Sequence, residues 1–156
     1  PTRRSSDLFK KFPGIPMRQE IVAFPTFTVL NDAYNANPNS MAESIRAMGQ
    51  LQGTRKIAML GDMLELGDHS KAAHEEIGKI LGEEQYDMVF TFGDMMKITA
   101  SVAKQAGVPY VYVGKSHLDI ANTYYDVKQD GDVILVKGSR GLKMERIIED
   151  FKERHE

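Results

Sequence analysis

The chain has 156 residues, 42% of them hydrophobic and 27% charged, which suits one globular domain with a sizeable core. Its formal net charge of -2 gives no reason to expect a nucleic-acid partner, and the absence of cysteine excludes disulfides and thiolate metal sites. No apolar run approaches the roughly 18 residues of a membrane span, and no signal-peptide pattern opens the chain, so we expect no membrane partner.

Residues 1–9 are polar and basic and show no periodic pattern. We interpret them as a non-native or disordered tail and expect the folded domain to occupy residues 10–156. Because the chain begins at Pro1 and not at Met, we also expect further sequence upstream of it.

From Met17 onward, short apolar runs alternate with segments of helical periodicity. The short runs predict strands at 17–23, 26–31, 56–60, 86–92, 108–113 and 132–136. Apolar residues spaced three or four apart predict helices at 41–51, 70–82, 94–106, 116–127 and 142–151. We expect Ser40 to cap the first helix, with Glu43 as its capping-box partner.

This alternation predicts the fold class. It indicates a Rossmann-like, doubly wound α/β domain, with a mostly parallel sheet of about six strands flanked by about five helices. In such domains the functional loops lie at the carboxyl ends of the strands.

Gly114-Lys115-Ser116 follows a strand and opens a helix, where a phosphate-binding P-loop would end. A P-loop also needs a glycine five residues before Gly114, and Pro109 stands there. We therefore interpret the segment as a glycine turn with Ser116 as a helix N-cap.

The segment from Asn31 to Ser40 (NDAYNANPNS) carries far more polar side chains than a tight turn needs. It presents an acid, a phenol and several amides at the carboxyl end of a strand, and Asp32 is suited to accept hydrogen bonds from sugar hydroxyls. Asparagine-rich turns with a helix cap explain the pattern equally well, so both interpretations stay open.

Two further polar loops follow buried strands. Residues 61–67 (GDMLELG) hold two carboxylates between glycines, for which solvated surface acids are the favoured interpretation. Residues 136–141 (VKGSRG) hold two cations and a hydroxyl where backbone amides can face an anion, which favours a carboxylate or phosphate ligand. His69 and His74 are spaced wrongly for one helix face, so we expect no metal pair and a supporting role for His74.

Taken in this order, the motifs resemble the C-terminal domain of the Mur ligase family. The resemblance rests on Met17-Arg18-Gln19-Glu20, NDAYNANPNSM, MLGDMLELG followed by His74, and VKGSRGLKME, and it covers nearly the whole chain. The asparagine-rich segment is the most specific match, and VKGSR is a second, independent one.

The resemblance implies an ATP-dependent amide ligase of the bacterial cytoplasm that adds D-alanyl-D-alanine to UDP-N-acetylmuramoyl-tripeptide in peptidoglycan precursor synthesis. ATP would convert the tripeptide carboxyl to an acyl phosphate, which the dipeptide amine attacks, and Mg²⁺ would offset the phosphate charge. Family members also carry an N-terminal UDP-sugar domain and a central ATPase domain, which would be this chain's partners and would hold the magnesium. We therefore expect no metal ligand and no catalytic residue within this domain alone, and an inactive isolated chain.

The resemblance also implies ligand contacts. Arg18 would reach the nucleotide phosphates and Asp32 the ribose hydroxyls. The nucleotide side of the cleft would further be lined by Tyr34, Asn35 and Asn37.

On the other side, the incoming dipeptide or its carboxylate would be oriented by Lys137, Ser139 and Arg140. Three residues would either support a loop or contact a ligand: Asp62, Glu65 and His74.

Two alternatives remain beside this interpretation. A non-catalytic Rossmann-like binding module explains the sheet but gives no reason for three polar loops on one edge. A related amide ligase, such as a folylpolyglutamate synthase, would share the domain, but the NDAYNANP and VKGSR segments speak against it. A nucleotide-dependent dehydrogenase is disfavoured because no GxGxxG is present.

Overall fold

The computed structural model describes residues 20–155. Six strands in this range form one sheet in the order β1-β2-β6-β3-β4-β5. Their bounds are β1 Glu20–Ala23, β2 Phe27–Asp32, β3 Lys56–Gly61, β4 Met88–Phe92, β5 Tyr110–Val113 and β6 Asp132–Lys137. β1 runs antiparallel to β2 and every other neighbouring pair is parallel, which confirms the mostly parallel sheet. Arg18 and the tail at 1–9 lie outside the described residues.

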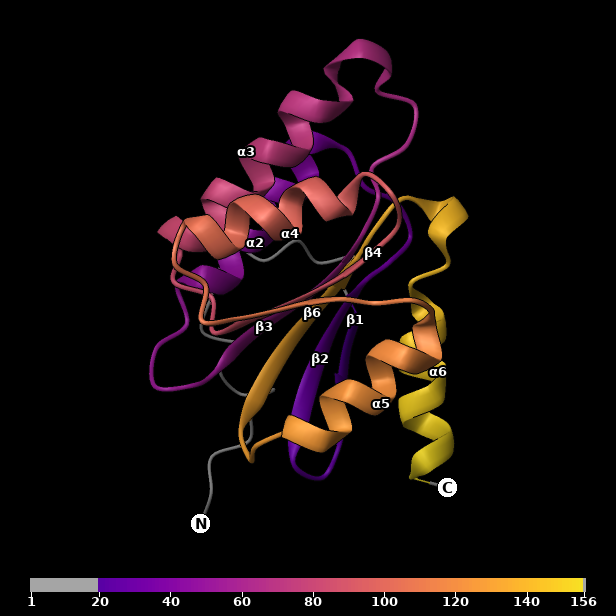
Figure 1. Ribbon diagram of the computed structural model, residues 1–156. Helices are drawn as coiled ribbons and strands as arrows, with labels where there is room; N and C mark the ends of the chain where they lie inside the picture. Colours follow the sequence, from indigo (N-terminus) through magenta and orange to yellow (C-terminus); the bar gives the residue numbers. More distant parts are fainter. Residues whose placement is uncertain (1–19, 156) are drawn as a thin grey trace.

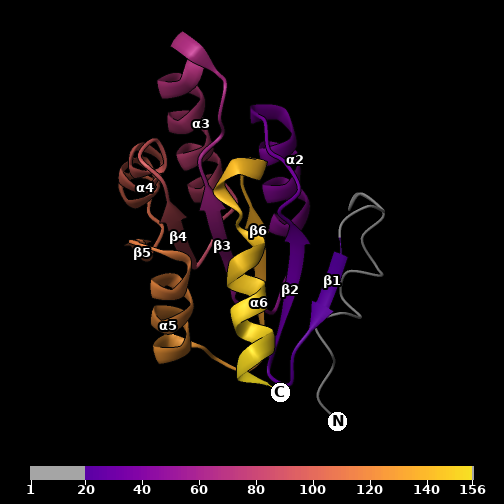
Figure 2. The same cartoon turned by 90° about the vertical axis from the view of Figure 1, so that its right-hand side faces the viewer.

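Five α-helices within the described range cover the two faces of the sheet (Figures 1 and 2). One face carries α2 (Pro38–Gly49), α3 (Ser70–Glu83) and α4 (Met96–Gln105), and the other carries α5 (His117–Val127) and α6 (Glu145–Arg154). Each face has its own buried cluster, because alternate residues of the strands point to opposite sides. This arrangement is the doubly wound α/β fold that the sequence predicts.

The order of the strands determines where the polar loops meet. The chain runs outward through β3, β4 and β5 with α2, α3 and α4 on one face, and then returns along α5 on the other face to place β6 between β2 and β3. The carboxyl ends of β2, β6 and β3 therefore lie side by side, with Lys137 in register with both Asp32 and Leu60. A reversal of strand order of this kind forms a crevice in which doubly wound domains bind ligands.

Two predicted helix starts are wrong. α2 begins at Pro38, and its cap is Asn37 and not Ser40: the Asn37 side chain accepts from the Ser40 backbone N–H, and the Ser40 hydroxyl accepts from the Asn37 N–H. Proline at the first helical position suits this earlier start because it has no N–H to satisfy. The last helix begins at Glu145, because a separate 3-10 turn, η2 (Arg140–Leu142), comes first and Lys143 follows it with a φ of 50°.

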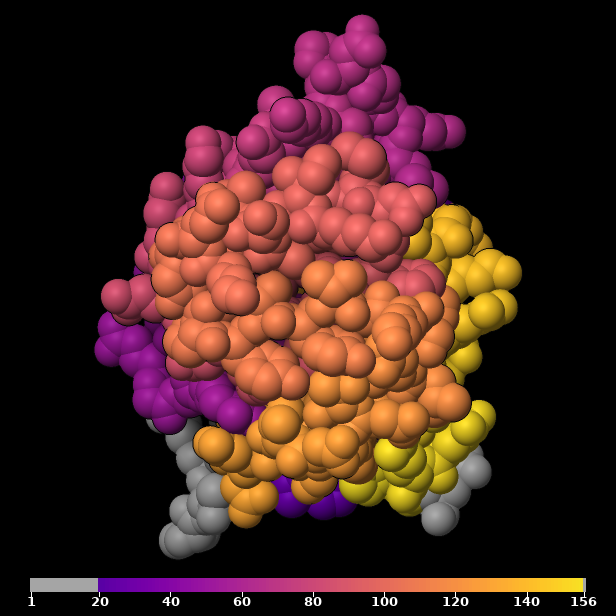
Figure 3. Space-filling model, in the orientation of Figure 1, coloured from indigo at the N-terminus to yellow at the C-terminus, as the bar shows by residue number. Residues whose placement is uncertain are grey.

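No helix between residues 20 and 155 is long and apolar enough to cross a membrane. The space-filling view shows one projection from the body, formed around the 3-10 turn η1 (Gly67–His69) and the start of α3 (Figure 3). That turn follows the GDMLELG loop, so the loop stands at the rim of the carboxyl edge of the sheet.

The raised pKa values of two buried tyrosines indicate how the free energy of unfolding should change at alkaline pH. Burial and the nearby Glu84 raise the pKa of Tyr86 well above its usual value, and burial together with Asp132 raises the pKa of Tyr124. Because the folded-state pKa values exceed the unfolded ones, the unfolded chain loses its protons first. Stability should therefore be complete below about pH 10 and fall as the pH rises further.

Urea unfolding of the Tyr86→Phe variant between about pH 9 and pH 11 tests this dependence. The variant should lose less free energy of unfolding across that range than the wild type does. Equal losses in the two proteins would show that Tyr86 does not contribute to the alkaline instability.

Candidate functional site

The three polar loops meet at one edge of the sheet, and two of them, residues 31–40 and 136–141, line a cleft of about 680 Å³. Most of its wall comes from the asparagine-rich segment 31–40, and the rest comes from β1, the end of β6, the 3-10 turn η2 and the start of α6. The lining residues are Glu20, Asn31, Asp32, Ala33, Tyr34, Asn35, Ala36, Asn37, Ser40, Lys137, Arg140 and Glu145. The structure therefore brings most of the sequence-predicted residues together in one place.

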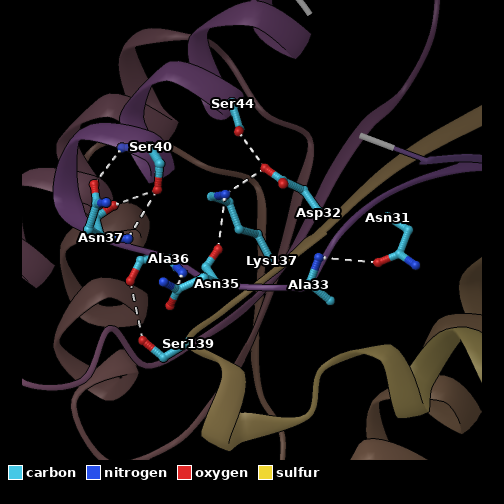
Figure 4. Close-up of polar contacts among 10 residues, drawn as sticks. All are labelled: Asn31, Asp32, Ala33, Asn35, Ala36, Asn37, Ser40, Ser44, Lys137 and Ser139. Carbon is cyan, nitrogen blue, oxygen red and sulfur yellow. Dashed lines mark hydrogen bonds and ion pairs between the residues drawn. The ribbon is translucent and has the colours of Figure 1, made fainter. Parts of the chain in front are cut away.

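Asp32 and Lys137 form an ion pair in the floor of this cleft (Figure 4). The Lys137 ammonium lies 2.5 Å from Asp32 Oδ2, donates to the Asn35 carbonyl at 3.2 Å, and is only 3% exposed. Ser44, which is buried on α2, donates its hydroxyl to the same Oδ2 at 2.7 Å. The predicted ribose-binding carboxylate is thus held from two different elements.

Ser139 connects all three loops. Its hydroxyl accepts from the Leu64 N–H at 2.8 Å and donates to the Ala36 carbonyl at 3.3 Å, while its own N–H donates to the Asp62 carbonyl at 2.9 Å. The residue is 5% exposed and does not line the cleft. Its hydroxyl therefore makes hydrogen bonds within the protein on both its donor and its acceptor side.

The asparagine side chains mostly shape their own segment. The side-chain Oδ1 atoms of Asn31 and Asn35 accept from the backbone N–H groups of Ala33 and Ala36, respectively, and the Asn37 side chain caps α2 (Figure 4). Turn and cap chemistry, one of the two interpretations left open by the sequence, is therefore present. It holds the segment in a fixed shape along the cleft, so it does not exclude a ligand there.

Tyr34 and Arg140 stand at the cleft as exposed groups. Tyr34 is 76% exposed, and the Arg140 guanidinium carbon lies 4.9 Å from the centre of its ring. The exposed guanidinium of Arg140 can bind the carboxylate of a ligand in the cleft through two parallel hydrogen bonds.

The GDMLELG loop is supported by the buried side chain of His74. His74 lies on α3 with no exposed surface, and its Nδ1 is 2.7 Å from the Ser70 carbonyl while its Nε2 is 3.2 Å from the Met63 N–H. A carbonyl only accepts and an N–H only donates, so Nδ1 carries the hydrogen and Nε2 accepts. His74 therefore holds the loop backbone in place.

Asp62 corrects the expectation of solvated loop acids. It is 7% exposed, and its Oδ1 accepts from the Met96 N–H at 2.7 Å, at the start of α4. It therefore satisfies a backbone donor at a helix N-terminus, where a negative charge is favourable. Glu65, by contrast, is exposed and has a φ of 62°.

Gly93 packs directly against Asp62, and this contact leads to a prediction. Gly93 has a φ of 113°, and an added Cβ would lie 2.4 Å from the Asp62 carboxylate. We expect Gly93→Ala to lower the free energy of unfolding by about 2 kcal/mol or more, because backbone strain adds to displacement of the cap. Thermal unfolding measures this, with Gly53→Ala as control because its φ is also positive, at 73°, but no atom lies within 4 Å of its Cβ position. If Gly93→Ala and Gly53→Ala lost the same free energy of unfolding, backbone strain alone would explain the loss, and the contact with Asp62 would contribute nothing.

The P-loop-like segment is a turn, as the sequence predicts. The Gly114 N–H donates to the Thr91 carbonyl at 2.7 Å, and an added Cβ would meet Ile120 at 2.3 Å, so close packing requires the glycine. The Ser116 hydroxyl accepts from the Asp119 N–H and caps α5.

The charges of the cleft indicate which part of a nucleotide it fits. Carboxylates and amides predominate; of the two cations that line it, Lys137 is paired with Asp32 and Arg140 lies over Tyr34. Such a surface fits sugar hydroxyls and a ring better than a triphosphate, which needs several cations or a metal ion. Within residues 20–155, no group of three or more His, Asp or Glu side chains could hold a metal ion.

Sequence reasoning missed three residues of this site. Glu20 and Glu145 line the cleft from β1 and α6, and Ser44 holds Asp32. Only Ser44 left a signal in the sequence. It is a polar residue on the apolar face of α2, beside Met41, Ile45 and Met48, where a buried hydroxyl needs a partner.

Comparison with known proteins agrees with this architecture. The family model described as the Mur ligase, glutamate ligase domain matches residues 17–140. The chain therefore belongs to the Mur ligase family, as its glutamate ligase (C-terminal) domain.

Individual relatives within the family share one name, UDP-N-acetylmuramoyl-tripeptide–D-alanyl-D-alanine ligase. The protein of that name from Bacillus subtilis is 37% identical over 88% of this chain and 31% of its own length, and the one from Escherichia coli is 31% identical over 80% and 27%. The crystal structure of MurF ligase from Thermotoga maritima in complex with ADP superposes with a TM-score of 0.75, at 28% identity, over 89% of this chain and 31% of that one. The chain thus spans about a third of the length of the relatives it matches.

Proposed function

We propose that this chain is the C-terminal domain of an ATP-dependent ligase that joins D-alanyl-D-alanine to UDP-N-acetylmuramoyl-tripeptide in the bacterial cytoplasm. The observation that carries the proposal is the cleft itself: a carboxylate held in a fixed position and an exposed guanidinium both line one ligand-sized space. Relatives that carry the name of this ligase, one of them crystallised with ADP, support the choice of substrates.

On the nucleotide side, Asp32 accepts hydrogen bonds from the ribose hydroxyls, and Tyr34, Asn35 and Asn37 form the adjoining wall. We assign the binding of the nucleotide phosphates to Arg18, which precedes the described residues. Mg²⁺ supplies charge compensation at the phosphates when bound, and we assign its ligands to the preceding ATPase domain because no candidate group lies within residues 20–155.

On the dipeptide side, Arg140 binds the carboxylate of D-alanyl-D-alanine and thereby directs its amine toward the activated tripeptide carboxyl. The amine attacks the acyl phosphate formed with ATP, and the products are the amide, ADP and phosphate. Asp62, His74 and Ser139 keep the loops in register beneath these groups. Closure of this domain over the central one excludes the water that would hydrolyse the acyl phosphate.

Product formation in three proteins tests the proposal. They are the isolated chain, the full-length ligase that carries it, and a truncated ligase that ends just before residue 17 and so lacks this domain. Only the full-length ligase should release ADP and form amide, and only with D-alanyl-D-alanine and not with glutamate as the amine. Turnover by the isolated chain or by the truncated ligase would contradict the proposal. Turnover with glutamate would favour the folylpolyglutamate synthase alternative, and full-length protein without any turnover would favour a binding module.

A further inference from the structure

Lys137 is a buried cation that points toward the asparagine-rich segment. Its ammonium contacts the Asp32 carboxylate at 2.5 Å and the Asn35 carbonyl at 3.2 Å, and the residue is 3% exposed. Arg140 lies three residues further on, in the 3-10 turn η2, and its guanidinium is exposed and stacks on the Tyr34 ring. The two cations of the VKGSR segment therefore face different partners.

A second residue, Ser44 on α2, contacts the same carboxylate. It lies on the buried face of α2 at 3% exposure, and its hydroxyl donates to Asp32 Oδ2 at 2.7 Å. Figure 4 shows Ser44 and Lys137 converging on this one oxygen from the helix and from the neighbouring strand. Because both donors belong to regular elements, the direction of the carboxylate is fixed before any ligand arrives.

The fixed orientation of the Asp32 carboxylate affects how tightly it binds a ligand that carries two neighbouring hydroxyl groups. The Asp32 side chain keeps 14% of its surface exposed and lines the cleft, so it faces both the buried cation and the open space. A side chain that is already held in its bound geometry loses little conformational entropy when it accepts hydrogen bonds. If it could rotate, the same acid would bind the hydroxyls more weakly.

We propose that Lys137 and Ser44 are positioning residues for Asp32, and that this pair sets the preference of the ligase for nucleotides with ribose hydroxyls. The inference rests on the proposed function, in which Asp32 binds the ribose. It moves Lys137 from the dipeptide side, where the sequence placed it, to the nucleotide side, and leaves the dipeptide carboxylate to Arg140.

The test is the ratio of kcat/KM for ATP to kcat/KM for 2′,3′-dideoxy-ATP, measured with the full-length ligase. Asp32→Ala should abolish the preference for ATP and so sets the lower limit of the ratio. Lys137→Met should lower the ratio by roughly tenfold and Ser44→Ala by about threefold, because each removes a hydrogen bond that holds the carboxylate. In both variants the KM for D-alanyl-D-alanine should stay near the wild-type value.

Lys56→Met is the matched control, because Lys56 is a second buried lysine, 8% exposed, whose ammonium donates to the Gly49 and Glu84 carbonyls. It should destabilise the protein without changing the nucleotide ratio. If Lys137→Met does not fold, Ser44→Ala decides the question alone, since it leaves no unpaired charge. A ratio that falls in Asp32→Ala but not in Ser44→Ala or Lys137→Met overturns the positioning role, as does a KM increase confined to the dipeptide. A ratio that Asp32→Ala leaves unchanged refutes instead the assignment of the ribose to Asp32 in the proposed function.

Discussion

Replacing Asp132 with alanine should lower the free energy of unfolding by about 3 kcal/mol, because it removes a fully buried carboxylate, breaks its ion pair with the partly buried Arg55 and leaves buried donors without their acceptor. Asp132 has no exposed surface, and its carboxylate accepts from Arg55 Nε and Nη2 at 2.8 Å each, from the Tyr124 hydroxyl at 2.7 Å and from the Gln129 N–H at 2.9 Å. These partners join the start of β6 to α5, to the loop after it and to the residue before β3. Removing the carboxylate therefore loosens four segments at once.

Urea unfolding of the isolated chain, followed by circular dichroism, measures the loss. The control is Asp150→Ala, which removes an ion pair with Arg154 in which both side chains are partly exposed, at 20% and 28%. This pair should contribute under about 1 kcal/mol. If Asp132→Ala were as mild as its control, Asp132 would not organise this end of the sheet.

Replacing Arg140 with alanine should raise the KM of the full-length ligase for D-alanyl-D-alanine by roughly 10- to 100-fold, which corresponds to the loss of a charge-assisted hydrogen bond. The guanidinium is exposed at the cleft and is stacked on Tyr34, so its removal takes away a binding group without burying an unpaired charge. Arg140→Lys should recover only part of the affinity, because an ammonium cannot form the two parallel hydrogen bonds.

Initial rates at varied dipeptide concentration give this KM. Lys143→Gln is the control, since Lys143 is an exposed cation three residues away that does not line the cleft, and it should leave the KM near the wild-type value. Tyr34→Ala separates the stacking contact from the charge. A dipeptide KM unchanged by Arg140→Ala would remove Arg140 from the dipeptide side.

The fold could be predicted from the sequence because its signals are local. Continuous apolar runs such as KIAML and DVILV are typical of strands covered on both faces, and amphipathic segments between them require helices on the sheet. Helix starts are harder to predict from the sequence, because asparagine and serine are both good caps. The NPNS sequence offers both, and Pro38 at the first helical position decides for Asn37.

The candidate site was only partly predictable, since its contacts join distant residues. The sequence placed Asp32 and Lys137 at strand ends, but only the return of β6 between β2 and β3 makes them neighbours. The sequence does not indicate which way the Lys137 side chain points, so the resemblance groups Lys137 with its neighbours Ser139 and Arg140 on the dipeptide side. The residue pattern alone favours solvated acids in the GDMLELG loop for the same reason: the donor that Asp62 binds, the Met96 N–H, comes 34 residues later.

Hydrogen–deuterium exchange of the full-length ligase tests most directly whether this cleft is the nucleotide and dipeptide half of the site. ADP should slow exchange of the backbone amides in residues 31–37, and D-alanyl-D-alanine with ADP and phosphate should slow those in residues 139–143. Residues 117–127 of α5, on the other face of the sheet, should exchange unchanged in both cases. Protection by both ligands that lies wholly outside residues 20–155 would contradict this account.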